Sequence, residues 1–313
     1  MKKSTATAPK KAAASKAAAS RPDVFQMVTD RIVTALEGGI IPWRKPWNAG
    51  AGAPRNYVSG HVYQSINAFL LGMLPYEYPL FMTYKQAEQV GGQVRKGEKG
   101  MMVVYFSHIQ KENKQTGEKD VFPLLRYSTV FNIAQIDGVD WKLPELQTRE
   151  HEPHAEAERI CVNYMGELEG PSLYFKGDQA LYRKSVDEVL MPAPQTFNSV
   201  EGYYATLFHE LAHSTGHQRR LNRPELVENA GFGSTTYAKE ELTAEMTAAF
   251  LSAAAGLDMS ATIDNATAYI QNWLNALKND KKLVLSAASL AQKAFYHITG
   301  QTAPTYEAAP AEE

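Results

Sequence analysis

The chain has 313 residues, 44% of them hydrophobic and 10% aromatic, which is long enough for two domains that each bury a core. Its net charge is −2, and it shows neither a run of about 18 apolar residues nor an apolar leader, so a membrane span and a secretory signal are not expected. The single cysteine, Cys161, excludes an internal disulfide framework, and we expect a soluble, cytoplasmic protein with no membrane partner.

Charge is distributed unevenly along the chain. Residues 1–100 carry 14 Lys and Arg against 6 Asp and Glu, a balance of +8, so the other 213 residues carry −10. A basic front part joined to an acidic back part predicts a polyanionic partner for the first and a different partner for the second.

Residues 1–21, MKKSTATAPKKAAASKAAASR, form a basic tail that we predict to be disordered, because they offer almost no side chains for a core. Two roles for this tail stay open. It is either a solvated leader or a segment that helps to hold nucleic acid through nonspecific charge.

The first predicted domain spans residues 22–140 and mixes helices with strands. An apolar stripe at helical spacing predicts a helix over 22–37, and a second helix is expected around 65–74. The stretch TYKQAEQVGG predicts a third, short helix, because Thr83 and Gln86 have the spacing of a capping box. MMVVYFSHI and VFPLLRYSTVFNI then predict a hairpin of two strands with a long polar loop.

The second predicted domain spans residues 154–300 and follows a linker over 141–153, WKLPELQTREHEP. We expect it to be mainly helical with a small sheet, to which the strand-like run LYRKSVDEVLM belongs. Residues 301–313 should form a disordered acidic tail. The predicted fold class is therefore α+β with two domains.

The stretch LFHELAHSTGHQRRL carries the clearest chemical motif. We predict a helix over about 199–215, with a capping box that starts at Asn198. His209 and His213 then lie one turn apart on the same face, and Glu210 directly follows the first of them. This is the HExxH pattern, in which two imidazoles hold a zinc ion and the carboxylate takes the proton of a water molecule.

A third ligand is expected from the later stretch YAKEELTAEMTAAFL. It predicts a largely buried helix with Glu241 and Glu245 one turn apart on one face, where unpaired carboxylates would be costly. The stretch resembles the signature of glutamate zincins, with Glu241 as the ligand and Glu245 orienting a histidine. The reverse assignment stays open, as does pairing of both acids with Lys or Arg. His217 is a further alternative ligand, or a neighbour of the site.

Three protein ligands leave a zinc position for water, which is typical of catalytic rather than structural sites. Zinc lowers the pKa of such water to about 7, and Glu210 can take its proton as it attacks a carbonyl. We therefore predict peptide-bond hydrolysis, with Glu210 as the catalytic residue and Tyr237 or His217 as alternative donors to the oxyanion. Zinc is the expected cofactor, and Mn or Co suits the same ligands.

The first domain also mixes aromatic and basic residues in a way typical of single-strand binding. Rings stack on unpaired bases while cations follow the phosphates, without sequence preference. Any one of these rings can equally belong to the core. Reading of duplex DNA would require a recognition helix or zinc fingers, and the sequence shows neither. The predicted DNA-binding residues are Trp43, Arg44, Lys45, Trp47, Arg55, Tyr57, Tyr84, Lys85, Arg95, Lys96 and Lys99.

From about residue 22 to residue 300, the sequence resembles the ArdC-type antirestriction proteins of conjugative plasmids. The stretches DVFQMVTDRI, IPWRKPW, TYKQAEQVGGQVRKGEKG and VFN look like the front domain that these proteins share with TraC-type plasmid primases. HELAHSTGHQRRLNR and FGSTTYAKEELTAEMTAAFL resemble their zincin-like metallopeptidase domain.

The resemblance implies a front domain that binds single-stranded DNA and a protein that shields incoming plasmid DNA from host restriction. Two hypotheses follow. In the first, DNA binding brings a zinc peptidase to a host protein substrate. In the second, coating of the strand alone protects the DNA, and the metal site is structural or catalytically silent. A priming accessory is a weaker third class, because the front domain lacks a polymerase-like acidic cluster.

Overall fold

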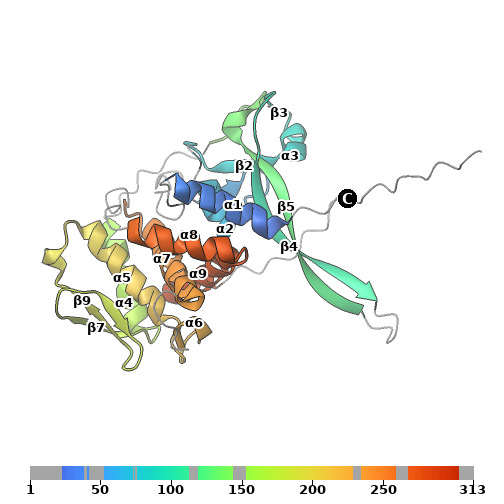
Figure 1. The fold of residues 1–313 in the computed structure, drawn as a ribbon. Coiled ribbons are helices and arrows are strands. Elements are labelled where there is room, and N and C mark those ends of the chain that lie inside the picture. The colour runs from blue at the N-terminus through green and yellow to red at the C-terminus, as the bar shows by residue number, and fades with distance from the viewer. Residues whose placement is uncertain are drawn as a thin grey trace, which may run out of the picture.

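The computed structural model describes residues 23–38, 41, 53–72, 74, 76–112, 119–143, 153–227, 234–258 and 267–302. Figure 1 shows two parts, with elements α1 to β6 in the first and α4 to α9 in the second. The predicted α+β class with two domains is confirmed. The predicted basic tail, most of the predicted linker and nearly all of the acidic tail lie outside the described residues. Among the described helices, none has the length and apolar character that a membrane span requires.

The helices of the first part lie close to where the sequence places them. Helix α1 (Val24–Glu37) begins at Asp23, whose side chain accepts a hydrogen bond from the Gln26 amide. Helix α2 (Ile66–Gly72) is almost entirely buried. In α3 (Tyr84–Gln89), the predicted capping box is present, because Thr83 and Gln86 each bond the backbone of the other.

A four-stranded sheet with the order β1-β2-β5-β4 forms the centre of the first part. Strands β4 (Met101–Glu112) and β5 (Lys119–Asn132) pair antiparallel over the whole length of β4, as the predicted hairpin requires. They extend as a long ribbon beyond the body of the molecule (Figure 1). Two short strands, β1 (Arg55–Asn56) and β2 (Leu80–Thr83), complete the sheet.

A second, two-stranded sheet pairs β3 (Gln93–Val94) with β6 (Ile136–Asp137). A short 3-10 helix, η1 (Ile133–Gln135), leads from β5 into β6. After β5, which is the last strand of the main sheet in chain order, the chain therefore passes through η1 into the small sheet beside α3.

The second part begins with α4 (Pro153–Gly166) and a three-stranded sheet of order β7-β9-β8. Its strands are β7 (Ser172–Phe175), β8 (Leu181–Arg183) and β9 (Glu188–Met191). The run LYRKSVDEVLM is therefore a hairpin rather than one strand. Asp187 lies in its turn with φ 55°, a conformation that short polar side chains tolerate.

Two further helices carry the predicted site. Helix α5 (Val200–Ser214) includes the HExxH motif, and α7 (Thr235–Ala255) follows the short α6 (Pro224–Val227). The predicted N-cap Asn198 is wrong by one residue, because Ser199 accepts the hydrogen bond of the Gly202 amide instead. A 3-10 turn, η2 (Pro194–Thr196), precedes this cap.

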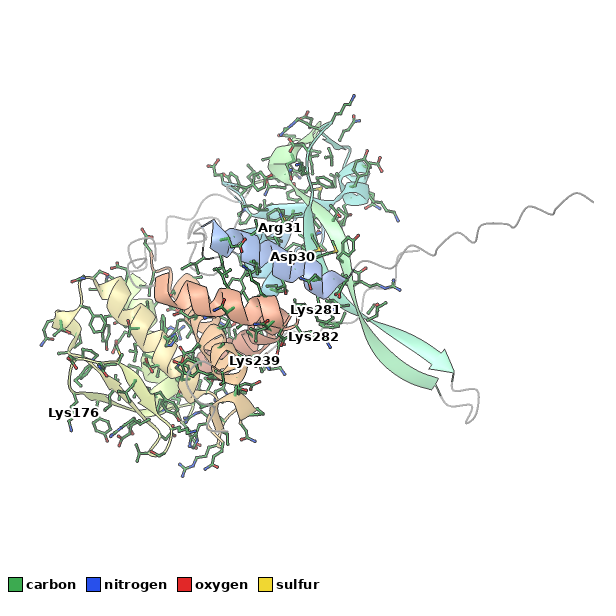
Figure 2. All side chains as sticks on the ribbon, viewed as in Figure 1. Asp30, Arg31, Lys176, Lys239, Lys281 and Lys282 are labelled. Atoms are coloured by element: carbon green, nitrogen blue, oxygen red, sulfur yellow. The ribbon has the colours of Figure 1, made fainter. Side chains whose placement is uncertain are left out.

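One hydrophobic core joins the two parts. Buried residues of α1 and α2 pack in the same cluster as residues of α7, α8 (Thr267–Asn279) and α9 (Leu283–Thr299). Ion pairs follow this boundary, because Lys278 binds Glu37 and Lys281 binds Asp23. Figure 2 shows Lys281 next to α1. The first part is therefore packed on the second as well as linked to it through the chain.

A second core holds the motif helix in place. Leu207, Phe208 and Leu211 of α5 pack against α4, the small sheet and Leu251 of α7. The hydroxyl of Tyr164 on α4 forms a hydrogen bond of 2.9 Å with that of Ser214 at the end of α5. One face of α5 is thus fixed by apolar packing, which leaves the histidine face directed toward α7.

Candidate metal centre and nucleic-acid surface

Helix α5 presents its two motif histidines toward each other. The side chains of His209 and His213 are 20% and 11% exposed, and their rings meet edge to face with centroids 4.7 Å apart. Their Nε2 atoms are 3.1 Å apart. One helical turn between the two residues therefore brings both nitrogens to a single point, as the spacing in the sequence predicts.

Helix α7 brings Glu241 to the same point. One carboxylate oxygen lies 3.5 Å from His209 Nε2, and the other lies 3.6 Å from His213 Nε2. The ligand atoms of these three residues all lie within 4.8 Å of one another. Among the described residues, this is the group with the composition and spacing of a metal site.

The donor set fits a divalent ion. A tetrahedral ion with imidazole nitrogens and a carboxylate oxygen at roughly 2.0–2.2 Å needs ligand atoms about 3.3 Å apart. The two Nε2 atoms, 3.1 Å apart, are close to that separation, and each of them has one of the two Glu241 oxygens at 3.5 or 3.6 Å. Two nitrogens and one oxygen also form a donor set that zinc, manganese and cobalt all accept.

A carboxylate lies behind each histidine on its Nδ1 side. Glu245 Oε1 is 3.7 Å from His209 Nδ1, and Glu240 Oε1 is 3.1 Å from His213 Nδ1. The sequence predicted a role for Glu245 beside Glu241 but none for Glu240. The signal in the sequence that could have indicated a role for Glu240 is an acid next to Glu241 on a helix predicted to be largely buried. The structure shows that Glu240 is indeed buried.

The site carries an excess of negative charge. Burial opposes protonation of His209, yet Glu241, Glu245 and Glu210 together raise its pKa to about 9. Burial raises the pKa of the Glu241 carboxyl, but hydrogen bonds from His209 and Tyr237 and the electrostatic influence of the neighbouring imidazoles hold it below its usual value. The same carboxylates lie where they would stabilise a divalent cation.

The other predicted site residues occupy three different positions. Glu210 is buried next to His209 and is not a member of the three-residue cluster. The hydroxyl of Tyr237 donates to Glu241. His217 is buried, accepts a hydrogen bond from the Arg219 amide at its Nδ1, and is not brought into the cluster.

The predicted DNA-binding residues that the structure describes gather at one end of the first part. Tyr84 and Lys85 begin α3, and exposed Lys96 and Lys99 lie in the turn after β3. Tyr84 is 48% exposed. Figure 1 shows α3 and β3 at the end of the molecule away from α4 and α5.

Of three further candidates, Arg95 and Tyr57 are partly engaged within the protein. Arg95 is exposed but forms ion pairs with Glu98 and Asp137. The half-buried ring of Tyr57 packs edge to face on Trp141 at 5.1 Å. Arg55 is exposed on β1.

The remaining candidates are the run that contains Trp43, Arg44, Lys45 and Trp47. These four lie outside the described residues. Tyr63, another ring of the first domain, belongs to the buried core.

The sequence matches two family models in chain order. Residues 22–131 match the N-terminal domain of the anti-restriction factor ArdC, and residues 162–290 match the zincin-like metallopeptidases. Both matches agree with the two parts of the structure and with their order.

Two curated relatives share about the same part of this chain. The protein y4eC of Sinorhizobium fredii (strain NBRC 101917 / NGR234) is 35% identical over 286 residues, which cover 87% of this chain and 90% of y4eC. The DNA primase TraC of Escherichia coli is 35% identical over 291 residues, which cover 86% of this chain but 26% of the primase. The chain thus corresponds to about a quarter of that primase.

Two solved structures have the same fold. The metal-free crystal structure of the antirestriction protein ArdC from plasmid R388 is 37% identical, with a TM-score of 0.72, and the match covers 90% of this chain and 100% of that one. Its Mn(II)-bound crystal structure is likewise 37% identical, with a TM-score of 0.70 and coverage of 89% and 97%.

Proposed function

This chain belongs to the ArdC family of antirestriction proteins, and we propose that it protects incoming plasmid DNA by joining single-strand binding to a zinc-dependent peptidase. The DNA-binding domain spans residues 22–140, and the peptidase domain spans residues 154–300. The observation that carries the proposal is the convergence of two imidazole nitrogens and the Glu241 carboxylate, beside a second, buried carboxylate at Glu210.

The proposed metal ligands are His209, His213 and Glu241. The zincin-like family match and the Mn(II)-bound form of R388 ArdC support a divalent metal in this fold. Distances of 3.5 and 3.6 Å to the two Nε2 atoms favour Glu241 over Glu245, whose oxygen faces the Nδ1 side of His209. Zinc is the metal that we propose, and manganese or cobalt would suit the same donors.

When bound, the metal supplies a Lewis acid that polarises a carbonyl and makes water easy to deprotonate near neutral pH. Glu210 takes the proton of the attacking water on a carboxylate oxygen and then delivers it to the nitrogen of the leaving amine. Attack forms the new C–O bond and places negative charge on the carbonyl oxygen; when that C=O bond re-forms, the C–N bond breaks, so the products are a carboxylate and an amine. Tyr237, which donates to Glu241, is within reach of the site as a donor to the developing oxyanion.

The end of the first part formed by α3 and the turn after β3 is the proposed surface for single strands. An exposed tyrosine ring at Tyr84 beside the cations Lys85, Lys96 and Lys99 combines base stacking with phosphate contacts. The similarity to a DNA primase over this region supports a nucleic-acid partner.

The alternative function is coating of single strands with a catalytically silent metal site. Burial of Glu210 beside the cluster favours the peptidase, because a purely structural site has no use for a further acid that ligates nothing. The proteolytic model then requires a host protein substrate bound near the DNA.

Transfer of an unmodified plasmid into a restricting recipient separates the two functions. We would compare the transfer frequency with the wild type, a Glu210→Gln variant and no protein. If proteolysis protects the plasmid, the variant should behave like no protein although it accumulates normally. Full protection by the variant would establish coating as the mechanism.

A further inference from the structure

The ring of His213 lies between two carboxylates of the same helix. Its Nδ1 is 3.1 Å from Glu240 Oε1, and its Nε2 is 3.6 Å from Glu241 Oε1. Glu240 and Glu241 are consecutive on α7, so their side chains leave the helix about 100° apart and reach opposite sides of one imidazole. Only Glu241 belongs to the proposed ligand set, and the proposed reaction leaves Glu240 without a role.

A buried arginine holds Glu240 in this position. Arg223 Nε donates to Glu240 Oε2 at 2.9 Å, and Nη2 donates to Oε1. The side chains of both residues are almost fully buried. This is the bidentate geometry that fixes a carboxylate in one orientation. Glu240 is thus an ionised acceptor, and the hydrogen of its contact with His213 must come from Nδ1.

Arg223 also binds the end of the motif helix. Its Nη2 donates to the carbonyl of Ala212 at 3.0 Å, and its Nη1 donates to the hydroxyl of Thr215. A Cβ added to Gly216 would lie 2.9 Å from Nη2, so the guanidinium occupies space that only glycine leaves free there. One side chain therefore joins α5, which carries both histidines, to α7, which carries Glu241.

We propose that Arg223 and Glu240 are a positioning pair that fixes the orientation and tautomer of His213, so that its Nε2 lone pair is directed at the metal position. Because Glu240 accepts a hydrogen bond from Nδ1–H, the hydrogen stays on Nδ1 and Nε2 carries none. The hydrogen bonds of Arg223 to Glu240 on α7 and to Ala212 on α5 set the spacing of the two helices. The inference rests on the metal site proposed above. Carboxylates that accept from a ligating histidine commonly strengthen metal binding in this way.

Two double variants isolate the acceptor from the ion pair. Arg223→Met with Glu240→Gln removes both buried charges but keeps an oxygen that can accept from Nδ1. Arg223→Met with Glu240→Leu removes both charges and the acceptor. Each variant removes both members of the buried ion pair, so neither member is left without its partner. We therefore expect both variants to fold, and thermal unfolding of each would establish that they do.

Zinc affinity, measured by competition with a chelator, is the first readout. We expect the Leu variant to bind Zn²⁺ about 10–100-fold more weakly than the Gln variant. Long-range 1H–15N spectra of the metal-free proteins are the second readout, and they should place the His213 hydrogen on Nδ1 in the wild type and lose that preference in the Leu variant. Neither readout depends on peptidase activity.

The partly buried pair of Arg220 and Asp187 supplies a control, because Asp187 contacts no proposed ligand. Asp187→Asn should lower stability and leave the Zn²⁺ affinity unchanged. Equal affinities of the Gln and Leu variants, or an equal loss in Asp187→Asn, would overturn the positioning role while leaving the metal site intact. Absence of Zn²⁺ binding by the wild type would overturn both proposals.

Discussion

Phe69 of α2 and Phe250 of α7 stack with ring centroids 4.6 Å apart and planes 22° apart. The contact joins the first part of the molecule to the helix that carries Glu241 and Glu245. The same cluster includes Leu242 and Met246, which directly follow Glu241 and Glu245 on α7. The core shared by the two parts and the metal position are therefore built on different faces of one helix.

This shared core predicts a single unfolding transition. Phe250→Ala should cost about 3–5 kcal/mol, as expected for a buried phenylalanine, and should lower the midpoint of the whole molecule. Calorimetry of the full chain measures this. Tyr174→Ala, which removes an exposed ring, should change stability by less than about 0.5 kcal/mol. Two separate transitions, with only one displaced by Phe250→Ala, would show that the parts unfold independently.

Glu210→Gln should abolish hydrolysis and leave metal binding unchanged. The substitution keeps the size of the side chain but removes its capacity to take a proton, so kcat/KM on an unfolded protein substrate should fall about 10²–10⁴-fold. Metal content measured on the same preparation is the control, because Glu210 is not a member of the ligand cluster. Loss of the metal together with activity would instead make Glu210 part of the metal site.

Binding of single-stranded DNA should depend on Lys96 and Lys99. If each contacts one phosphate, Lys96→Gln with Lys99→Gln should lower the magnitude of the slope of log affinity against log salt by about 1.4. Fluorescence anisotropy of a labelled oligonucleotide over a salt series gives this slope. Lys176→Gln is the control, because Lys176 is exposed on the second part, far from α3 (Figure 2). The wild type should bind the single strand more tightly than the duplex, and equal affinity for the two forms would contradict the proposed surface.

The pair of Asp187 and Arg220 should make stability depend on acid pH. Burial by itself raises the pKa of Asp187, but hydrogen bonds from Arg220 and Tyr182 hold it below its ordinary value of 3.8. The contribution of this pair is therefore complete above about pH 4 and is lost as pH falls through the lower, folded-state pKa. Asp187→Asn removes this pH dependence.

Urea unfolding at a series of pH values measures this effect. At neutral pH, Asp187→Asn should cost close to the lower end of the roughly 3–5 kcal/mol expected for one half of a buried pair, because the Asp187 side chain is 19% exposed. The difference between the two proteins should shrink below pH 4. The exposed pair of Arg159 and Glu156 is a useful comparison, because Glu156→Gln should cost no more than about 1 kcal/mol.

Local patterns in the sequence located the motif helix and its chemistry. The spacing of His209 and His213 placed both on one face, and the structure brings their Nε2 atoms within 3.1 Å. The capping box of Thr83 and Gln86 was also predictable, because both partners lie within one turn. The N-cap of α5 was misplaced because Asn198 and Ser199 are both good capping residues, and backbone geometry decides between them.

Features that depend on distant partners could not be read in the same way. The pairing of Arg223 with Glu240 joins residues 17 apart, one just before α6 and the other on α7. The packing of α1 on α8 brings Glu37 to Lys278, across most of the chain. The backbone of Asp187 has a left-handed conformation in the turn between β8 and β9, so a run that looks like one strand is divided in two. The pairing of the two strands sets that conformation. Tertiary packing determines each of these features.

The metal content of the purified protein tests the central claim most directly. We would measure bound zinc, manganese and cobalt by mass spectrometry in the wild type, Glu241→Ala and Glu245→Ala, after equal exposure to each metal. The account predicts about one equivalent of metal in the wild type and in Glu245→Ala, and almost none in Glu241→Ala. Metal retained in full by Glu241→Ala would contradict the shared site of His209, His213 and Glu241.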